Sequence, residues 1–303
     1  MKAVVCTKYG SPEVLKIKEI EKPKPKDDEI LIKVHATTAH IGDTRIRKAD
    51  PFLARLVFGL FKPKENLILG MELSGEVESI GKNVKSFAKG DKVFGFTGFD
   101  LGSYAEYKCM PEKLLKRKGF VLLMPENLSY REASALPTGS LTALKNLQKA
   151  TIKAGQKILI NGASGSLGTY AIQLAKYFGA EVTAVCSAAN LELVKSIGAD
   201  KVIDYTKEDF TKSDEKYDII YDAVVKSKLS DCKKILKPNG IFLNNSRLPK
   251  IEEKDLLFLK DLIEKDILKP VIDRTYSLTE IVEAHRYVDK GHKKGNVVIS
   301  VCE

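Results

Sequence analysis

The 303-residue sequence predicts an α/β protein that combines a β-rich part with a doubly wound parallel sheet. Two observations predict this fold class. Residues 1–125 contain short strands separated by Pro, Gly, Asn and Asp turns, a pattern typical of a barrel-like or sandwich module. From Ser129 onward the hydrophobic period changes and strands alternate with helices, which is typical of βαβ units in a parallel sheet.

In the β-rich part, the pattern predicts strands at residues 30–34, 74–80 and 92–96. The segment 45–62 differs, because it mixes large apolar side chains with Arg and Lys. It is either a helical or looped lid packed against the barrel, or a basic apolar surface that faces substrate or touches a membrane.

In the second part, Ser129 is the candidate N-cap of a helix over 130–136, which Pro137 interrupts and which resumes at 140–148. The chain ends with a helix over 279–290 and a strand over 297–301, so the tail is expected to rejoin the β-rich part. We therefore predict one domain from residues 1–125 with 273–303, and a second from 126–272. Further strands are expected at 157–160, 181–186, 201–204, 217–221 and 241–244, and further helices at 166–176, 191–197, 227–236 and 252–265.

A glycine-rich turn follows the strand at 157–160. Ala163, Gly165 and Gly168 form the pattern A-x-G-x-x-G of dinucleotide-binding turns. Gly165 would let the backbone approach a pyrophosphate, Gly168 would let the helix pack closely on the strand, and the first helix amides would face the anion. The alternative is a turn that serves close packing alone. The predicted dinucleotide contacts are Ser164, Gly165, Ser166, Leu167 and Gly168.

The composition is 44% apolar and 30% charged, which is typical of a globular protein. No run of eighteen apolar residues occurs and the N-terminus is strand-like, so we expect no spanning helix, no signal peptide and a cytoplasmic location. Five scattered cysteines without a C-x-x-C pattern favour free thiols. The net charge of +10 indicates either an anionic partner or a solvated surface. Because the lysines are spread along the chain without a nucleic-acid module, we expect no nucleic-acid partner.

Several separated stretches resemble the medium-chain dehydrogenase/reductase superfamily, specifically its zinc-independent quinone oxidoreductase branch. The resemblance implies a GroES-like catalytic domain, a Rossmann-type cofactor domain, and a cleft between them for hydride transfer from a nicotinamide. The stretches are LGMELSGEV at 69–77, GSYAEY at 102–107, ALPTGSLTAL at 135–144, the glycine turn, 191–205 with SIGAD, and 291–299.

The same resemblance bears on zinc. Zinc-dependent members use a Cys, the His of a G-H-E motif and a second Cys, because thiolate and imidazole suit tetrahedral zinc. Here the motif reads Gly70-Met71-Glu72, the first Cys position falls at about His40, and the second falls within Leu136-Pro137-Thr138. Only Cys109 lies near the structural-zinc lobe, so we expect no metal at either site. A quinone or enone, which is already electrophilic, can accept hydride without one.

Two residues are candidates for catalysis. His40 stands where many members have asparagine, and it either hydrogen-bonds the substrate and stabilises negative charge on a carbonyl oxygen, or is a plain loop histidine. Asp43 matches an aspartate common in the family, and it either orients a proton relay or caps a helix or turn. The other histidines, His35, His285 and His292, lack ligand spacing and are expected to be structural.

The strand over 181–186 ends without the acidic residue that selects NAD. Ser187 can donate to a phosphate oxygen, and the resemblance places Tyr205 beside the adenosine end, so we expect NADPH rather than NADH. Members that prefer NADPH often carry Arg or Lys where this chain has Ala189 or Asn190, so the strongest phosphate contact is absent. Thr138 and Asn190 complete the predicted cofactor contacts.

Family members also carry about a strand and a helix more between Arg247 and Leu248. The short connection is either a deletion or a loop missing from the recorded sequence, and it leaves a homodimer through that sheet edge open. We therefore expect an NADPH-dependent, zinc-independent reductase of quinones or α,β-unsaturated carbonyls. Two alternatives are a metal-free alcohol or aldehyde oxidoreductase, and a cofactor-binding interaction or sensor protein without turnover.

Overall fold

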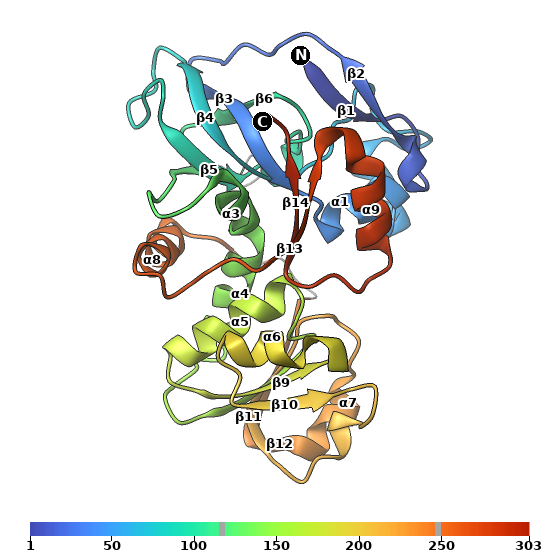
Figure 1. Cartoon of the computed structure of the whole chain (residues 1–303), viewed down its shortest axis with the longest axis vertical. Coiled ribbons are helices and arrows are strands. Elements are labelled where there is room, and N and C mark those ends of the chain that lie inside the picture. Colours follow the sequence, from blue (N-terminus) through green and yellow to red (C-terminus); the bar gives the residue numbers. More distant parts are fainter. Residues whose placement is uncertain (115–118, 246–249, 303) are drawn as a thin grey trace. The chain divides into compact units, whose positions relative to one another are not determined.

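The computed structural model describes residues 1–114, 119–245 and 250–302. The chain forms two compact units: unit 1 comprises residues 1–137 and 272–303, and unit 2 comprises residues 138–271 (Figure 1). Unit 1 therefore includes the helix α3 (Tyr130–Ala135). The domain boundary predicted at residue 125 places this helix in the second domain instead. The reason is packing, because α3 contacts four strands of unit 1, β3, β4, β5 and β14.

Unit 1 is built around a sheet with the strand order β13-β14-β3-β4-β5-β7, in which β6 also pairs with β3. β13 and β14 are parallel, and the other pairs are antiparallel. Apolar side chains of five of these strands form one core, which includes Ile32, Leu73 and Val93. The strands are β3 (Glu29–Thr38), β4 (Glu72–Ile80), β5 (Lys92–Phe96), β6 (Tyr107–Pro111), β7 (Phe120–Leu123), β13 (Ile272–Ser277) and β14 (Asn296–Ser300).

A second core of unit 1 lies between the hairpin of β1 (Lys2–Cys6) with β2 (Leu15–Glu19) and two helices. These helices are α1 (Ile41–Lys48) and α9 (Ile281–Asp289), which contact each other although far apart in sequence. A 3-10 turn at Phe52–Ala54 leads into the short helix α2 (Arg55–Phe58), whose Phe58 joins this core. The tail therefore rejoins unit 1 as expected.

Two helix starts illustrate local sequence control. Ser129 caps α3 as predicted, since its Oγ accepts from the backbone N–H of Glu132 and the Glu132 carboxylate accepts from Ser129 in return. The next helix, α4 (Pro137–Lys149), begins at Pro137 rather than at Ser140. Proline is tolerated in the first helical turn because the N–H it lacks has no intrahelical partner there.

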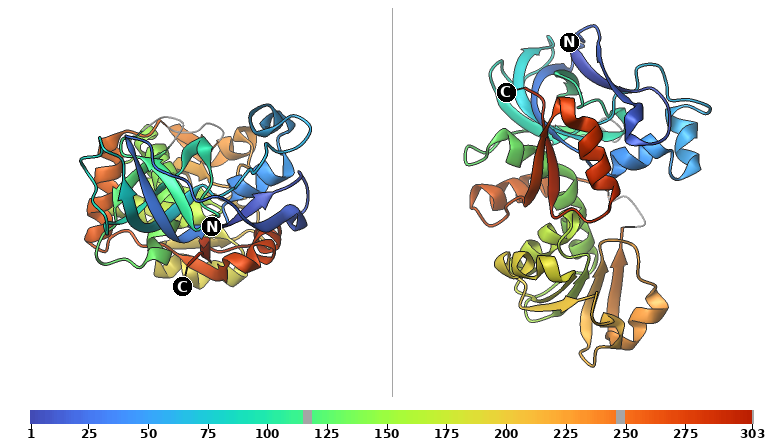
Figure 2. Two further views of the ribbon diagram at one scale, coloured as in Figure 1. Left: turned by 90° about the horizontal axis from the view of Figure 1, so that it is seen from above. Right: turned by 45° about the vertical axis from the view of Figure 1, so that its right-hand side comes forward.

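Unit 2 contains a five-stranded, fully parallel sheet with the order β10-β9-β8-β11-β12. Figure 2 (right) shows α5 and α6 on one side of this sheet and the α7 segment on the other, so the sheet is doubly wound as predicted. The strands are β8 (Lys157–Asn161), β9 (Glu181–Cys186), β10 (Lys201–Asp204), β11 (Tyr217–Asp222) and β12 (Leu236–Asn244), and the helices after α4 are α5 (Ser166–Tyr177), α6 (Leu191–Ser196), α7 (Leu229–Cys232) and α8 (Glu253–Glu264).

The helix predicted over 227–236 is shorter in the structure. It divides into α7 and a 3-10 turn at Lys233–Ile235, and β12 begins at Leu236. Pro238 disfavours helical backbone at Lys237, so the helix does not continue past this point.

Three further observations complete the fold. Within the described part of the chain, no helix combines the length and the hydropathy needed to cross a bilayer. All five cysteines are free. The short connection predicted at Arg247-Leu248 lies outside the described residues.

Candidate functional site

The glycine turn of unit 2 lies at the carboxyl end of the central strand β8 and leads directly into α5. The neighbours of β8 are β9 on one side and β11 on the other, so the turn is at the point where the winding direction of the sheet reverses. Ligands of open parallel sheets bind at such a point. The amides of Gly162 and Ala163 both donate to Val185 O of β9, over 3.1 and 3.0 Å, which holds the turn at this edge.

The two fingerprint glycines differ in their surroundings. A Cβ on Gly168 would lie 2.3 Å from Gly162 O and 2.6 Å from Ala163 Cα, so the helix packs on the turn at a distance that only glycine allows. A Cβ on Gly165 would meet nothing closer than Gly162 O at 3.5 Å. The space at Gly165 is therefore open. The first backbone N–H groups of α5 have no acceptor within their own helix, and they point outward at its N-terminal end.

Three of the predicted cofactor residues meet beside the turn. Asn190 Nδ2 donates to Ser164 Oγ over 3.0 Å and to Ser187 Oγ over 3.3 Å, which joins the glycine turn to the loop after β9. The Oδ1 atom of Asn190 is buried and has no hydrogen-bond partner among the described residues. A buried acceptor without a partner is costly, so this cluster offers a defined contact point for a hydroxyl donor.

Thr138 lies in the first turn of α4 and its hydroxyl oxygen is buried. At the adjacent Gly139, a Cβ would lie 2.7 Å from both Ser166 Oγ and the Tyr170 ring. The first turns of α4 and α5 are therefore in contact, which brings Thr138 close to the predicted pyrophosphate position at Ser166.

Tyr205 and Asp204 lie at the carboxyl end of β10. Tyr205 is 53% exposed, and its backbone N–H donates to Cys186 O over 3.2 Å, so the ring is available beside the end of β9. Asp204 is in register with Cys186 and is buried. Hydrogen bonds from the hydroxyl and the backbone amide of Thr206 lower the pKa of Asp204, so the carboxylate is ionised at neutral pH. The sequence alone placed no acid near the end of β9, but the neighbouring strand supplies one.

Sequence reasoning also missed the polar group at the end of β11. Asn161 Nδ2 donates to Asp222 Oδ1 over 3.2 Å and to Ser227 Oγ over 3.0 Å. Asp222 also accepts from the Ser227 amide over 2.6 Å. These bonds fix the strand ends on both sides of the winding reversal, and no sequence motif indicated them.

In unit 1, His40 is the N-cap of α1 and lies two residues after the end of β3. Its Nδ1 accepts from the backbone N–H of Gly42 over 3.0 Å. Burial, the Lys293 ammonium and the Arg45 guanidinium lower the pKa of His40 to about 3. The imidazole is therefore neutral, with its proton on Nε2, which makes that atom a hydrogen-bond donor.

Met71 lies on the other side of Gly42. A Cβ on Gly42 would be 2.5 Å from Met71 Sδ and 2.9 Å from His40 Nδ1, so the thioether and the imidazole converge on this glycine. The adjacent Glu72 is buried, and its carboxylate accepts from the Thr38 hydroxyl. Across the described ranges, no group of three or more His, Cys, Asp or Glu side chains is arranged to hold a metal ion.

Asp43 is fully buried behind His40. Its carboxylate accepts from Gly70 N over 2.9 Å, from His40 N over 3.3 Å and from the Tyr104 hydroxyl over 3.2 Å. Burial raises the pKa of Asp43 to about 7, and the three hydrogen bonds oppose that rise. Asp43 thus completes the cap of α1, and its hydrogen bonds also connect the loop at His40 with the loop at Gly70-Met71-Glu72.

The network continues to α9. Tyr104 Oη lies 3.1 Å from His285 Nε2, and Arg47 Nε donates to His285 Nδ1 over 3.3 Å. Arg47 also pairs with Asp289. Burial is the main cause that lowers the pKa of His285 to about 3, so this imidazole is neutral and carries its proton on Nε2, toward Tyr104. His285 is structural as predicted, and His35 is also structural because its ring stacks on Tyr130 at 4.2 Å.

Lys293 is a further group that the sequence did not single out. Burial lowers its pKa to about 8, while the nearby Glu72 and Asp273 carboxylates oppose that shift. The pairing of β14 with β3, in which Ala39 N donates to Val297 O over 2.9 Å, brings the loop before β14 beside His40. The sequence does not indicate that Lys293 lies beside His40, because only this long-range strand pairing brings the two together.

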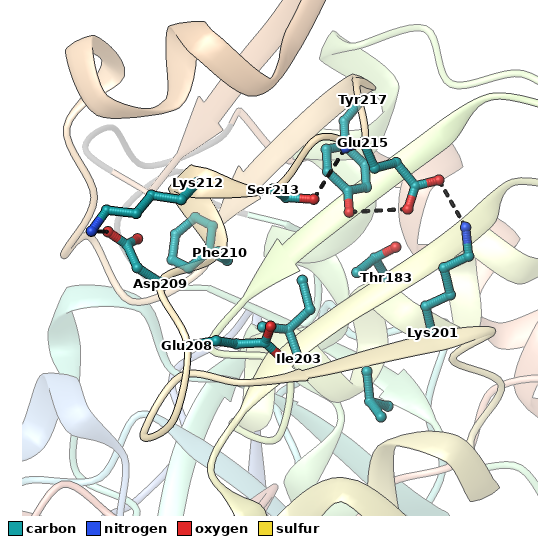
Figure 3. A pocket seen from close by; sticks show the side chains of 11 residues that line it. Thr183, Lys201, Ile203, Glu208, Asp209, Phe210, Lys212, Ser213, Glu215 and Tyr217 are labelled. Atoms are coloured by element: carbon teal, nitrogen blue, oxygen red, sulfur yellow. Dashed lines mark hydrogen bonds and ion pairs between the residues drawn. The ribbon is translucent and has the colours of Figure 1, made fainter.

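A separate open hollow in unit 2 lies away from the predicted dinucleotide position. Figure 3 shows Lys201 and Tyr217 at its wall, both linked to Glu215. Lys201 and Tyr217 are the first residues of β10 and β11, so the hollow lies toward the amino ends of the strands. Cofactors of this fold class bind at the opposite edge.

Three family models match parts of the chain, and known proteins match almost all of it. Residues 26–119 match the alcohol dehydrogenase GroES-like domain, and residues 166–267 and 243–299 match two zinc-binding dehydrogenase families. The 2-methylene-furan-3-one reductase of Solanum lycopersicum is 36% identical over 99% of this chain and 79% of that protein. The NADPH-dependent alkenal/one oxidoreductase, chloroplastic, of Arabidopsis thaliana is 32% identical over the same shares.

Among solved structures, the quinone oxidoreductase from Coxiella burnetii superposes with a TM-score of 0.89 at 31% identity, covering 100% of this chain and 99% of that one. Identity above 30% over almost the full length, together with the two units described above, confirms the expected family and fold. The chain therefore belongs to the medium-chain dehydrogenase/reductase superfamily of nicotinamide-dependent oxidoreductases, in its quinone oxidoreductase branch.

Proposed function

We propose that this protein is an NADPH-dependent, zinc-independent reductase that transfers hydride to quinones or α,β-unsaturated carbonyls. The similar proteins carry names of enone, alkenal and quinone reductases. The observation that carries the proposal is the neutral His40, which presents an Nε2–H donor where zinc-dependent members place a metal ligand.

The residues of unit 2 fit a dinucleotide. The open space at Gly165 gives the pyrophosphate access to the amides that begin α5, and Ser164, Ser187 and Asn190 supply polar contacts on one side. Leu167 and Gly168 contribute the next amides, and Thr138 flanks the turn. When bound, the reduced nicotinamide supplies the hydride.

The preference for NADPH rests on Ser187 and the exposed Tyr205 near the end of β9. The ionised Asp204 works against it, because a carboxylate repels a 2′-phosphate. We retain NADPH because no acidic residue lies on the loop after β9 itself, and because a similar protein is named NADPH-dependent.

The donor set in unit 1 does not fit zinc. Nδ1 of His40 is already engaged by Gly42, and a thioether such as Met71 is a poor zinc ligand beside thiolate, imidazole and carboxylate. The Glu72 carboxylate binds the Thr38 hydroxyl. We propose that the acceptor is reduced without a Lewis acid.

His40 and Asp43 then have distinct roles. Negative charge develops on the acceptor oxygen during reduction, and the Nε2–H of His40 is positioned to donate to an oxygen without first giving up a proton. Asp43 acts as a positioning residue, since it is fully buried and accepts from the backbone N–H of His40. The proton that completes reduction comes from solvent or from a group near the acceptor.

Two expectations stay predictions. The cytoplasmic location is one, since the names of similar proteins include chloroplastic and mitochondrial ones. A homodimer is the other. The acceptor is expected to be a small molecule, and nothing in the described residues adds a nucleic-acid module.

The direct test is spectrophotometric oxidation of NADPH and of NADH with quinones and enones as acceptors. We expect turnover with both acceptor classes, a higher kcat/KM for NADPH, and no loss of activity after treatment with a metal chelator. Saturated aldehydes and alcohols serve as the control substrates. Turnover on these alone, or cofactor binding without turnover on any acceptor, would overturn the proposal.

A further inference from the structure

The segment between α1 and β4 exposes an unusual amount of apolar surface. Six large side chains within ten residues lie at the surface of unit 1, and Phe61 is 89% and Leu56 70% exposed. A soluble monomer rarely gathers so many exposed large apolar side chains without a partner for them. We call this group the apolar patch: Phe52, Leu53, Leu56, Val57, Leu60 and Phe61.

The backbone of the patch is firmly attached to unit 1. Phe58 is buried in the core with the β1 strand, and the Tyr9 hydroxyl donates to Gly59 O over 2.7 Å. The Lys64 amide donates to Phe58 O over 2.8 Å, which closes the turn behind the patch. The six side chains are therefore presented outward by a fixed scaffold.

Three cations belong to the segment that carries the patch and have open donor positions. The side chains of Arg55, Lys62 and Lys64 make no hydrogen bond or ion pair with any residue in the described ranges. Arg55 stacks between the Tyr9 and Phe52 rings, 5.0 and 4.9 Å from their centroids, and its Nε is buried without a hydrogen-bond partner there. Lys48, by contrast, is paired with Asp289 at 2.8 Å.

The segment itself carries only positive charges. Residues 51–64 contain Arg55, Lys62 and Lys64 but no Asp or Glu, and the acidic residues Asp50 and Glu65 lie directly outside it. Exposed apolar side chains on one segment with cations that lack ion-pair partners match the interface of an anionic bilayer, where acyl chains contact the apolar groups and lipid phosphates pair with the cations.

We propose that the apolar patch docks the protein on the surface of a membrane that contains anionic lipids. The protein lies on the bilayer through this segment and does not span it. The proposal is independent of the reductase activity, because it concerns only unit 1 and requires no cofactor.

The test is co-sedimentation of the full chain with vesicles. We expect binding to vesicles of phosphatidylcholine and phosphatidylserine in equal amounts, little binding to pure phosphatidylcholine, and release at high salt. The double variant Leu56→Ser/Phe61→Ser removes the most exposed apolar groups, and Lys62→Gln/Lys64→Gln removes two cations. Each pair is expected to weaken vesicle binding at least about tenfold.

Matched variants carry the same changes elsewhere. Leu257→Ser alters a 57% exposed leucine of α8, and Lys153→Gln/Lys207→Gln removes two exposed lysines of unit 2. These should bind vesicles like the unaltered protein. Because all the altered side chains are exposed, each variant is expected to fold, which far-UV circular dichroism and NADPH oxidation verify.

Three results would overturn the proposal. One is the absence of binding to either vesicle type. Another is equal binding by Leu56→Ser/Phe61→Ser and by the unaltered protein. The third is self-association without vesicles, seen by sedimentation velocity and abolished by Leu56→Ser/Phe61→Ser, which would assign the patch to a second copy of the chain.

Discussion

The backbone N–H of Gly42 donates to Nδ1 of His40 across 3.0 Å, and this single bond determines which proton the imidazole presents. A neutral imidazole that accepts at Nδ1 keeps its proton on Nε2. The low pKa of His40, about 3, keeps it neutral through the physiological range. The side chain is therefore a hydrogen-bond donor of fixed polarity rather than a general acid that titrates near neutrality.

The first prediction concerns this donor. His40→Ala should lower kcat/KM for an enone about a hundredfold, the usual effect of removing one donor to a developing oxyanion. His40→Asn keeps a side-chain N–H and should retain most of the activity. Steady-state kinetics of NADPH oxidation measure both variants. An unchanged kcat/KM in His40→Ala would show that His40 takes no part in the reaction.

The second prediction concerns the pH dependence of stability through Asp43. Burial raises its pKa in the folded protein to about 7, above the value of 3.8 in an exposed carboxyl. The folded state therefore binds the proton more tightly than the unfolded state between these values. The contribution of Asp43 to the free energy of unfolding should be greatest below about pH 4, fall as the pH rises to about 7, and then stay constant.

Asp43→Asn isolates this contribution, because all other carboxyl groups remain. Urea unfolding of the two proteins at several pH values should give a difference, unaltered protein minus variant, that declines from about pH 4 to about pH 7. A difference that does not change with pH would show that Asp43 has an ordinary pKa.

The third prediction concerns Tyr104, whose hydroxyl joins Asp43 to His285 inside unit 1. Tyr104→Phe leaves buried polar groups without that partner, so the free energy of unfolding should fall by about 1–3 kcal/mol. Tyr177→Phe is the matched control, since Tyr177 is 45% exposed and its loss of a hydroxyl should change stability by less than about 0.5 kcal/mol. Equal effects of the two substitutions would show that the network contributes nothing.

The fourth prediction separates the two fingerprint glycines. Gly168→Ala places a methyl group 2.3 Å from Gly162 O, so it should destabilise the free protein by about 1–3 kcal/mol. Gly165→Ala meets only an ordinary contact at 3.5 Å and should cost the free protein about 0.5 kcal/mol.

Gly165→Ala should nevertheless abolish cofactor binding, because its methyl group occupies the space needed by the pyrophosphate. Thermal unfolding measures the first effect, and calorimetric titration with NADPH measures the second. Normal NADPH affinity in Gly165→Ala would mean that the diphosphate does not lie on this turn.

The fifth prediction concerns cofactor choice. Asp204 is ionised and in register with Cys186 at the end of β9, so its charge opposes a 2′-phosphate held by Ser187 and Tyr205. Asp204→Asn keeps an acceptor for Thr206 and should raise the ratio of kcat/KM for NADPH over NADH about threefold to tenfold. If the ratio falls or stays the same, the 2′ position lies elsewhere.

The sequence by itself determined the two-part architecture and most helices and strands. Local signals are sufficient for these features: the hydrophobic period changes at Ser129, Ser129 and Glu132 form a capping box, and glycines spaced three apart follow a buried strand. Each of these patterns acts within one turn of a helix or one strand, so it can be read without knowing the rest of the fold.

Only the tertiary structure decided which side chains meet. Arg47 and His285 are 238 residues apart and touch because α9 returns to pack on α1. Asp204 comes to the end of β9 through the register of two parallel strands, and the Lys293 loop reaches His40 through the pairing of β14 with β3. Strand order and crossover direction depend on the packing of the whole sheet. Which residues form the polar network, and which lie at the predicted cofactor-binding edge of the sheet, is therefore decided only in the folded chain.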